Sequence, residues 1–212
     1  MRVITGSAKG HKLKAPKGLA TRPMLDRVKE SLFSVLEGYG PIRGRVLDLY
    51  AGTGSLGIEC LSRGAAWADF VERSAHVCRI IRANLAHTNF LDRARVFQMP
   101  VARYLATARP AEKYAIIVMD PPYADPAIED TIRAVGASGL LVEGGLLVVG
   151  HSPRVTLADT YGPLRRLTLR RLGDSCFSIY ELGPAVPGGE YVDQAEDAGK
   201  PSPRALQAPG KR

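Results

Sequence analysis

The chain has 212 residues, 45% of them apolar, which is enough for one well-buried α/β domain. No apolar run approaches the roughly 18 residues needed to span a bilayer, and the N-terminus lacks the apolar segment of a signal peptide. We therefore expect a cytoplasmic protein without a membrane contact. The three cysteines and four histidines show no metal-ligand spacing, so we interpret the cysteines as reduced core residues and expect no metal site.

The net charge of +8 is concentrated near the N-terminus of the chain. Residues 1–45 contain ten Lys and Arg residues against three acidic ones, a net charge of +7. Such a basic segment is typical of proteins that bind a nucleic-acid backbone. A solvated basic arm without a ligand would have the same composition.

The first 40 residues predict a basic hairpin followed by a helix. Residues 2–5 and 11–15 have the pattern of two short strands joined by a turn at residues 6–10. Apolar residues then recur at helical spacing from Val28 up to Gly38. Arg27 could equally contact RNA or pair with an acid on its own helix. The candidate RNA-binding residues of this region are Lys9, Lys12, Lys14, Arg22 and Arg27.

From residue 45 onward, strand-like and helix-like segments alternate. Strands are predicted at residues 46–50, 68–71, 95–98, 114–119 and 146–149, and helices at residues 56–63, 75–87, 101–108 and 128–137. This alternation predicts an α/β fold with a doubly wound, Rossmann-like, mostly parallel sheet covered by helices on both faces. Residues 164–171 and 176–182 predict an antiparallel C-terminal hairpin that completes a seven-stranded sheet.

Three parts of the chain are predicted from this pattern. Residues 1–40 form the N-terminal hairpin and helix, residues 41–183 form the doubly wound domain, and residues 184–212 form a disordered tail. The tail contains five Pro and four Gly among 29 residues and almost no bulky apolar side chain. It therefore cannot bury enough surface to offset the entropy of ordering.

A glycine motif lies at the junction of the first predicted strand and its helix. Gly52, Gly54 and Gly57 have the spacing GxGxxG, which arises by chance in about one such chain in four or five, so its context carries the argument. Asp48 belongs to the strand before the motif, and Glu72 ends the next strand, where a carboxylate can accept the hydroxyls of a ribose. An adenosine-containing cofactor is predicted, with NAD and S-adenosylmethionine as the two options.

Charge favours S-adenosyl-L-methionine as the cofactor. The pyrophosphate of NAD needs an anion site, and Asp48 would repel it, whereas the same carboxylate suits the cationic amino-acid part of S-adenosylmethionine. A buried acid that caps the glycine loop is an alternative role for Asp48. The predicted cofactor contacts are Asp48, Ala51, Gly52, Gly54, Glu72, Arg73 and Asp120.

The sequence Asp120-Pro121-Pro122-Tyr123 follows an apolar strand and should arise by chance in roughly one chain of this length in 250. In a doubly wound sheet, the first and fourth strands are neighbours where ligands bind. The Asp120 carboxylate and the Pro121 carbonyl can accept both hydrogens of a planar amino group and free its lone pair for methyl transfer. The prolines fix the backbone, and Tyr123 can stack on a base for about 1 to 3 kcal/mol. These four residues are predicted to be catalytic.

Four stretches, residues 2–13, 21–33, 48–65 and 120–123, have a recognisable order and spacing. In these stretches the chain resembles the RsmD family of 16S rRNA (guanine-N2)-methyltransferases, and residues 21–33 are the family-specific part. The resemblance covers about residues 1–183. It implies a class I methyltransferase domain and methylation of N2 of one guanine in 16S rRNA, presented within an assembling small ribosomal subunit. A monomer is expected.

Two positions depart from the family pattern. Met99-Pro100 stands where members usually have the Asp or Asn that contacts the adenine amino group. Adenine is therefore expected to be held by apolar packing and by the Val101 amide. Gly150-His151 stands near the end of the fifth strand, where the family often has Glu.

Two other classes of function stay open from the sequence. The same fold could methylate adenine N6 in DNA or RNA, or a glutamine amide, because all of these acceptors are planar amino groups. A non-catalytic RNA-binding assembly factor could also retain the fold. The acids at Asp48, Glu72 and Asp120 argue against this last hypothesis.

Overall fold

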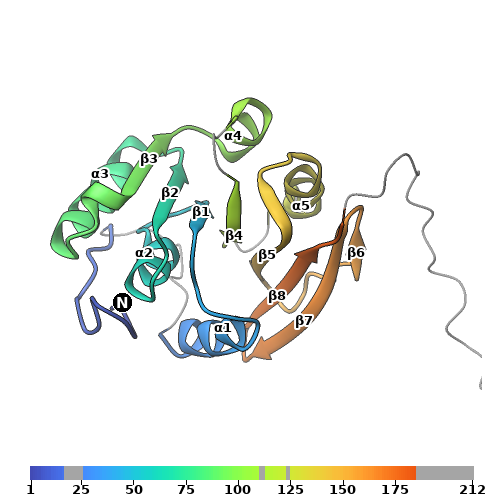
Figure 1. The fold of residues 1–212 in the computed structure, drawn as a ribbon, viewed down its shortest axis with the longest axis horizontal. Helices are drawn as coiled ribbons and strands as arrows, with labels where there is room; N and C mark the ends of the chain where they lie inside the picture. The colour runs from blue at the N-terminus through green and yellow to red at the C-terminus, as the bar shows by residue number, and fades with distance from the viewer. Residues whose placement is uncertain (17–25, 110–112, 123–124, 185–212) are drawn as a thin grey trace, which may run out of the picture.

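A computed structural model describes residues 1–16, 26–109, 113–122 and 125–184 of the chain. The predicted site residues Arg22 and Tyr123 and the predicted tail from residue 185 onward lie outside these ranges. Within them, eight strands form one sheet with helices on both faces (Figure 1). In chain order the elements are α1 (Asp26–Gly38), β1 (Arg45–Leu49), α2 (Ser55–Ser62), β2 (Trp67–Glu72), α3 (Ala75–His87), η1 (Leu91–Arg93), β3 (Ala94–Gln98), α4 (Val101–Thr107), β4 (Tyr114–Met119), α5 (Ile128–Ala137), β5 (Leu141–His151), β6 (Thr160–Tyr161), β7 (Leu164–Leu172) and β8 (Ser175–Leu182).

The strand order is β3-β2-β1-β4-β5-β8-β7-β6. The first five strands in this order pair in parallel, and β8, β7 and β6 add antiparallel pairs. The predicted doubly wound sheet with an antiparallel C-terminal hairpin is confirmed. The described sheet has eight strands rather than seven because β6 adds a two-residue edge strand, which is too short to produce a periodic sequence signal.

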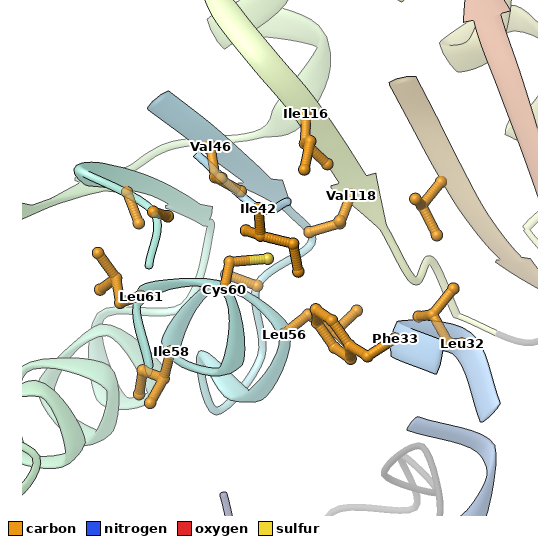
Figure 2. Close-up of a cluster of buried hydrophobic side chains, with 14 of the residues drawn as sticks. Leu32, Phe33, Ile42, Val46, Leu56, Ile58, Cys60, Leu61, Ile116 and Val118 are labelled. Atoms are coloured by element: carbon orange, nitrogen blue, oxygen red, sulfur yellow. The ribbon is translucent and has the colours of Figure 1, made fainter. Parts of the chain in front are cut away.

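Two hydrophobic layers hold the helices to the sheet. Because strand residues alternate in direction, one face of the sheet packs against α1, α2 and α3 and the other against α4 and α5 (Figure 1). Figure 2 shows the first layer, where Ile116 and Val118 of β4 face Cys60 of α2 and Phe33 of α1. As predicted, the three cysteines are free and buried. No helix among the described residues is long and apolar enough to cross a membrane.

The predicted helix and strand boundaries agree well with the structure where the local signals are strong. Helix α3 has the predicted bounds, and the Ser74 hydroxyl caps it by accepting the Val77 N–H at 3.4 Å. Strand β5 begins at Leu141, five residues before the predicted start. The register shifts near this end of the strand, and Gly144 has a φ of +70°, so the apolar pattern is interrupted inside the strand.

The N-terminal segment does not form the two predicted strands. Its antiparallel pairing is reduced to a single bridge between Arg2 and Lys12. The Ile4 and Thr5 N–H groups instead donate to the Glu59 carboxylate of α2 at 2.8 and 3.0 Å. Because a side chain of another element takes these donors, they cannot form a strand ladder. The prediction was correct for the direction of pairing and wrong for its extent.

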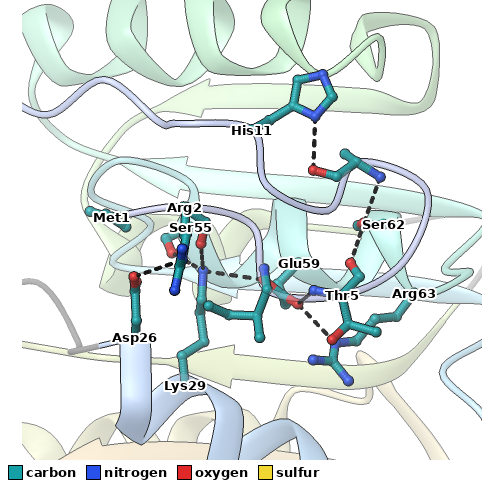
Figure 3. A network of polar contacts seen from close by, with 12 residues as sticks. Met1, Arg2, Thr5, His11, Asp26, Lys29, Ser55, Glu59, Ser62 and Arg63 are labelled. Carbon is teal, nitrogen blue, oxygen red and sulfur yellow. Dashed lines mark hydrogen bonds and ion pairs between the residues drawn. The ribbon is translucent and has the colours of Figure 1, made fainter.

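A buried ion pair joins this segment to α1 and α2 (Figure 3). Lys29 and Glu59 are both fully buried, with Lys29 Nζ 3.2 Å from Glu59 Oε2. Lys29 Nζ also donates to the Arg2 carbonyl oxygen at 2.6 Å and to Ser55 Oγ at 3.1 Å, and Arg63 Nε donates to Glu59 Oε1 at 2.9 Å. Burial lowers the pKa of Lys29, and Glu59 opposes that shift. Lys29 therefore faces inward and does not add to the basic surface of residues 1–45.

Residues 1–16 also contact the glycine loop and α3. Asn84 of α3 donates to the carbonyl oxygens of Thr53 and Lys14 at 2.9 and 3.0 Å and accepts the Lys14 N–H at 2.8 Å. Gly6 has a φ of +88°, and a Cβ there would lie 1.8 Å from the Ser62 carbonyl oxygen, so only glycine fits this contact. The predicted division of the chain at residue 40 stays a prediction.

Candidate active site

The candidate site lies where β1 and β4 end. These strands pair in parallel with Leu49 opposite Met119, so the prediction that they are neighbours is confirmed. Adjacent strands lie about 4.8 Å apart, which places the start of the glycine loop close to Asp120. The strand order reverses at β1, and ligands of doubly wound folds bind outside the carboxyl ends of the strands at such a point.

Asp48 holds the glycine loop against the start of α2. Its side chain is buried, and Oδ2 accepts the Gly57 N–H at 2.8 Å, which satisfies a donor in the first turn of the helix. Burial raises the pKa of Asp48 well above its usual range, the Gly57 N–H opposes this, and the charges of Asp120 and Glu72 raise the pKa further. The loop-capping role is therefore present in the structure. A contact between Asp48 and the cofactor stays a prediction.

Glu72 faces the glycine loop from the end of β2. Its Oε2 accepts the Gly52 N–H at 3.3 Å, and its Oε1 accepts the Ser74 N–H at 2.8 Å. The backbone thus orients a partly exposed carboxylate whose oxygens keep lone pairs for further donors such as hydroxyl groups. Arg73 follows Glu72 directly and is exposed.

The predicted adenine contacts lie next to Glu72. The Met99 N–H donates to the Glu72 carbonyl oxygen at 3.1 Å, and Val101 is the first residue of α4. Pro100 precedes this helix without a side-chain cap, so the first-turn N–H groups have no intrahelical partner. Backbone donors at the start of α4 therefore follow Met99 closely in the chain, and the assignment of these groups to adenine stays a prediction.

The Asp120 loop follows β4 directly. Asp120 is partly exposed, Pro121 is buried and Pro122 is exposed, while Tyr123 lies outside the described residues. Desolvation raises the pKa of the Asp120 carboxyl group to about 6. Asp120, Asp48 and Glu72 lie close enough for their charges to interact. Burial favours the neutral form of Asp48, so the negative charge of the site comes from Glu72 and from ionised Asp120, and it favours a cationic ligand.

Tyr50 is a feature of the site that sequence reasoning missed. It has a φ of +57°, which is uncommon for a residue other than glycine and marks a sharp turn between β1 and the glycine loop. Its hydroxyl forms a hydrogen bond of 3.0 Å with the Thr131 hydroxyl of α5. Nothing in the residue type predicts this backbone conformation.

The predicted RNA contacts are on the surface. Lys9, Lys12, Lys14 and Arg27 are all exposed. Asp26, one of the acids expected as an alternative partner of Arg27, lies 3.5 Å from Arg2. The assignment of these four residues to RNA stays a prediction.

Replacing Gly57 with alanine should reduce the free energy of unfolding by about 1 to 3 kcal/mol, because overpacking strains a dense core. The added Cβ would lie 2.4 Å from the Phe70 ring and 3.1 Å from Asp48 Oδ2. Urea unfolding followed by circular dichroism measures the change. Gly38→Ala is the control, since its Cβ meets no atom within 4 Å. Equal stability of the two variants would contradict the close packing of the loop on Asp48.

Comparisons with known proteins agree with this arrangement. Residues 1–181 match the family model described as "Conserved hypothetical protein 95". The chain is 37% identical over 182 residues to "Putative rRNA methyltransferase YlbH" of Bacillus subtilis (strain 168), covering 85% of this chain and 98% of that protein. It is 35% identical over 149 residues to "Ribosomal RNA small subunit methyltransferase D" of Escherichia coli (strain K12), covering 70% and 73%.

A solved structure of similar sequence has the same fold. "Putative methyltransferase yhhF from Escherichia coli" superimposes with a TM-score of 0.75 at 32% identity, covering 86% of this chain and 98% of that one. The site geometry, the family match over nearly all of the described chain and these similarities agree. The chain belongs to the RsmD family of class I methyltransferases.

Proposed function

We propose that this protein transfers a methyl group from S-adenosyl-L-methionine to the exocyclic N2 of one guanine in 16S rRNA of the small ribosomal subunit. The observation that carries the proposal is the register of β1 and β4, which brings the glycine loop and the Asp120-Pro121-Pro122 corner together. The names of the similar proteins support an rRNA substrate. The family resemblance of residues 21–33 supports guanine N2 as the acceptor.

The described residues fit the cofactor. Gly54 N–H donates to the Ala51 carbonyl oxygen at 2.7 Å, so the loop from Ala51 through Gly52 to Gly54 turns tightly and presents backbone rather than bulky side chains. The charges of Glu72 and Asp120 suit a cationic ligand, and we assign the ribose hydroxyls to Glu72, whose carboxylate the Gly52 and Ser74 N–H groups hold beside the loop. When bound, S-adenosyl-L-methionine supplies an electrophilic methyl group. We assign Val101 to the adenine of the cofactor and Arg73 to a further cofactor contact next to Glu72.

The residues after β4 orient the acceptor. The Asp120 carboxylate and the Pro121 carbonyl accept the two hydrogens of the guanine amino group, which aims the nitrogen lone pair at the methyl carbon. The two prolines restrict the backbone that holds these acceptors. We assign base stacking to Tyr123, and phosphate contacts to Lys9, Lys12, Lys14, Arg22 and Arg27. We also assign to Asp120 the proton that the nitrogen loses after transfer.

Nucleoside analysis tests this function. Purified protein is incubated with methyl-labelled cofactor and either 16S rRNA or small ribosomal subunits that lack the modification, and the RNA is digested to nucleosides. Label in N2-methylguanosine is expected. Label in N6-methyladenosine would assign the adenine alternative. No detectable cofactor binding by calorimetry would support the non-catalytic alternative. The same assay compares free rRNA with the assembling particle, and sedimentation of the active species tests the expected monomer.

The reaction should lose activity in acid because Asp120 must be ionised. Its pKa of about 6 predicts that kcat/KM falls roughly tenfold per pH unit below pH 6 and is level above about pH 7. Activity is lost on the acid side, and at a higher pH than for an ordinary aspartate, because the raised pKa lets the carboxyl group hold its proton up to a higher pH. A pH profile at limiting cofactor measures this. If the residual activity of Asp120→Ala keeps the same inflection, another group is responsible.

A further inference from the structure

A hollow lies on the α5 side of the sheet, beyond β5. It has a volume of about 220 Å³ and lies between the chain after β5 and strand β7. That volume is smaller than the roughly 300 to 1,000 Å³ of pockets that enclose a whole small-molecule ligand, so the groove fits one part of a larger ligand. Its lining residues include His151, Val155, Arg166, Leu169, Arg171 and Cys176.

The groove is close to the candidate active site. Met119 of β4 pairs with Val149 of β5, and His151 in the groove wall lies two residues further along β5. Strand β7 is two strands beyond β5 in the sheet. At about 4.8 Å per strand, the groove lies roughly 5 to 15 Å from β4. A polymer whose base reaches Asp120 could therefore extend a neighbouring unit into the groove.

One wall of the groove is held by neutral hydrogen bonds. His151 Nδ1 lies 3.0 Å from the Ser152 carbonyl oxygen, which can only accept, so Nδ1 carries the hydrogen. Nε2 then accepts from the Ser178 hydroxyl at 3.0 Å. Burial lowers the pKa of His151, which agrees with a neutral ring. The positive charge of the groove therefore comes from its arginines.

The groove combines apolar side chains with arginines. Leu169 is 49% exposed, and with Val155 it gives the groove an apolar surface. Arg166 is fixed on one side by the Leu157 carbonyl oxygen at 2.8 Å and by Asp159. Arg171 is exposed at the rim. An apolar platform next to guanidinium groups suits a base or ribose with its phosphate.

We propose that this groove binds a nucleotide that flanks the modified base of the substrate RNA. The sugar or base lies on Leu169 and Val155, and a phosphate contacts Arg171. The inference rests on the proposed function, because it assumes an RNA substrate. It places an RNA contact on the C-terminal half of the sheet, away from the basic residues of the N-terminal segment.

Neighbouring arginines of β7 provide a matched control. Arg171 pairs with Cys176, a groove residue, whereas Arg170 pairs with Phe177 of the opposite hydrophobic layer. The two arginines are adjacent and exposed, and their side chains leave opposite faces of the sheet. Arg171→Gln and Arg170→Gln therefore make the same change of charge on the same strand, and only Arg171→Gln alters the groove.

The experiment measures binding of each variant to unmodified 16S rRNA and to small ribosomal subunits over a range of salt concentrations. Arg171→Gln should weaken binding several-fold and reduce the slope of log K against log salt by about one, as the loss of one phosphate contact predicts. KM for RNA should rise, while kcat and cofactor affinity by calorimetry stay unchanged. Arg170→Gln should leave the slope within error of the wild type. Equal slopes for the two variants would overturn the inference.

A second variant tests the apolar surface formed by Leu169 and Val155, without a change of charge. Leu169→Ser should raise KM for RNA several-fold with no change in the salt slope, and circular dichroism checks its folding. Ultraviolet cross-linking to small ribosomal subunits should join residues 153–157 or 166–171 to a nucleotide. A cross-link of these peptides only to a ribosomal protein would overturn the inference. If the wild type neither binds nor methylates RNA, the proposed function itself fails. This outcome differs from equal salt slopes for Arg171→Gln and Arg170→Gln, which would overturn only the groove inference.

Discussion

Replacing Asp120 with alanine should lower the rate of methyl transfer by at least about 10² to 10³, the usual cost of removing one oriented polar group from a reaction centre. The variant keeps the Pro121 carbonyl but loses the acceptor for the second amino hydrogen, so the nitrogen lone pair stays delocalised. Labelled-methyl transfer measures the rate, and calorimetry should still detect cofactor binding. Asp130→Ala, an exposed acid on α5, is the control and should keep full activity. Equal loss of transfer and of cofactor binding would mean that Asp120 has a structural role.

The same variant should be more stable than the wild type at alkaline pH. Because desolvation raises the pKa of Asp120 to about 6, its ionised form is less favourable in the folded protein than in the unfolded chain. Removing it should raise the free energy of unfolding by about 1 to 2 kcal/mol at pH 8, allowing for solvent screening of a partly exposed group. The gain should shrink between pH 6 and pH 4 as the wild-type carboxyl becomes protonated. Urea unfolding at pH 4 and pH 8 tests this sign.

Replacing Glu59 with alanine should reduce the free energy of unfolding by about 3 to 5 kcal/mol, because it leaves the charge of Lys29 buried without its ionic partner. Lys29 and Glu59 have no exposed side-chain surface. The change also removes the acceptor for the Ile4 and Thr5 N–H groups. Denaturant unfolding measures the loss, and proteolysis should release the N-terminal segment faster than in the wild type.

Two variants separate the buried ion pair from a general effect of charge. Glu37 binds the same Arg63 at 2.8 Å but is 45% exposed, so Glu37→Ala should cost less than about 1 kcal/mol. Lys29→Met should cost less than Glu59→Ala, because Glu59 keeps Arg63 and two backbone donors. Similar losses for Glu59→Ala and Glu37→Ala would contradict the importance of burial. The loss in the free energy of unfolding should be largest for Glu59→Ala, smaller for Lys29→Met and smallest for Glu37→Ala.

The sequence by itself was sufficient for the order and type of nearly all described elements and for the proximity of the glycine loop to Asp120. Strand and helix periods are local properties, and a capping residue such as Ser74 acts within a few residues of where it stands. The pairing of β1 with β4 followed from the topology rule for alternating strands and helices, so the approach of the glycine loop to Asp120 could be predicted.

Only the tertiary structure decided the roles that depend on distant partners. The N-terminal backbone donors bind Glu59 instead of forming a hairpin ladder, and Lys29 turns inward instead of adding to the basic surface. Tyr50 takes a left-handed conformation, and the groove beside Arg171 forms where β5, β7 and β8 meet. Burial, desolvation and hydrogen-bond competition arise when segments far apart in the chain pack together, so no local pattern of residues carries them.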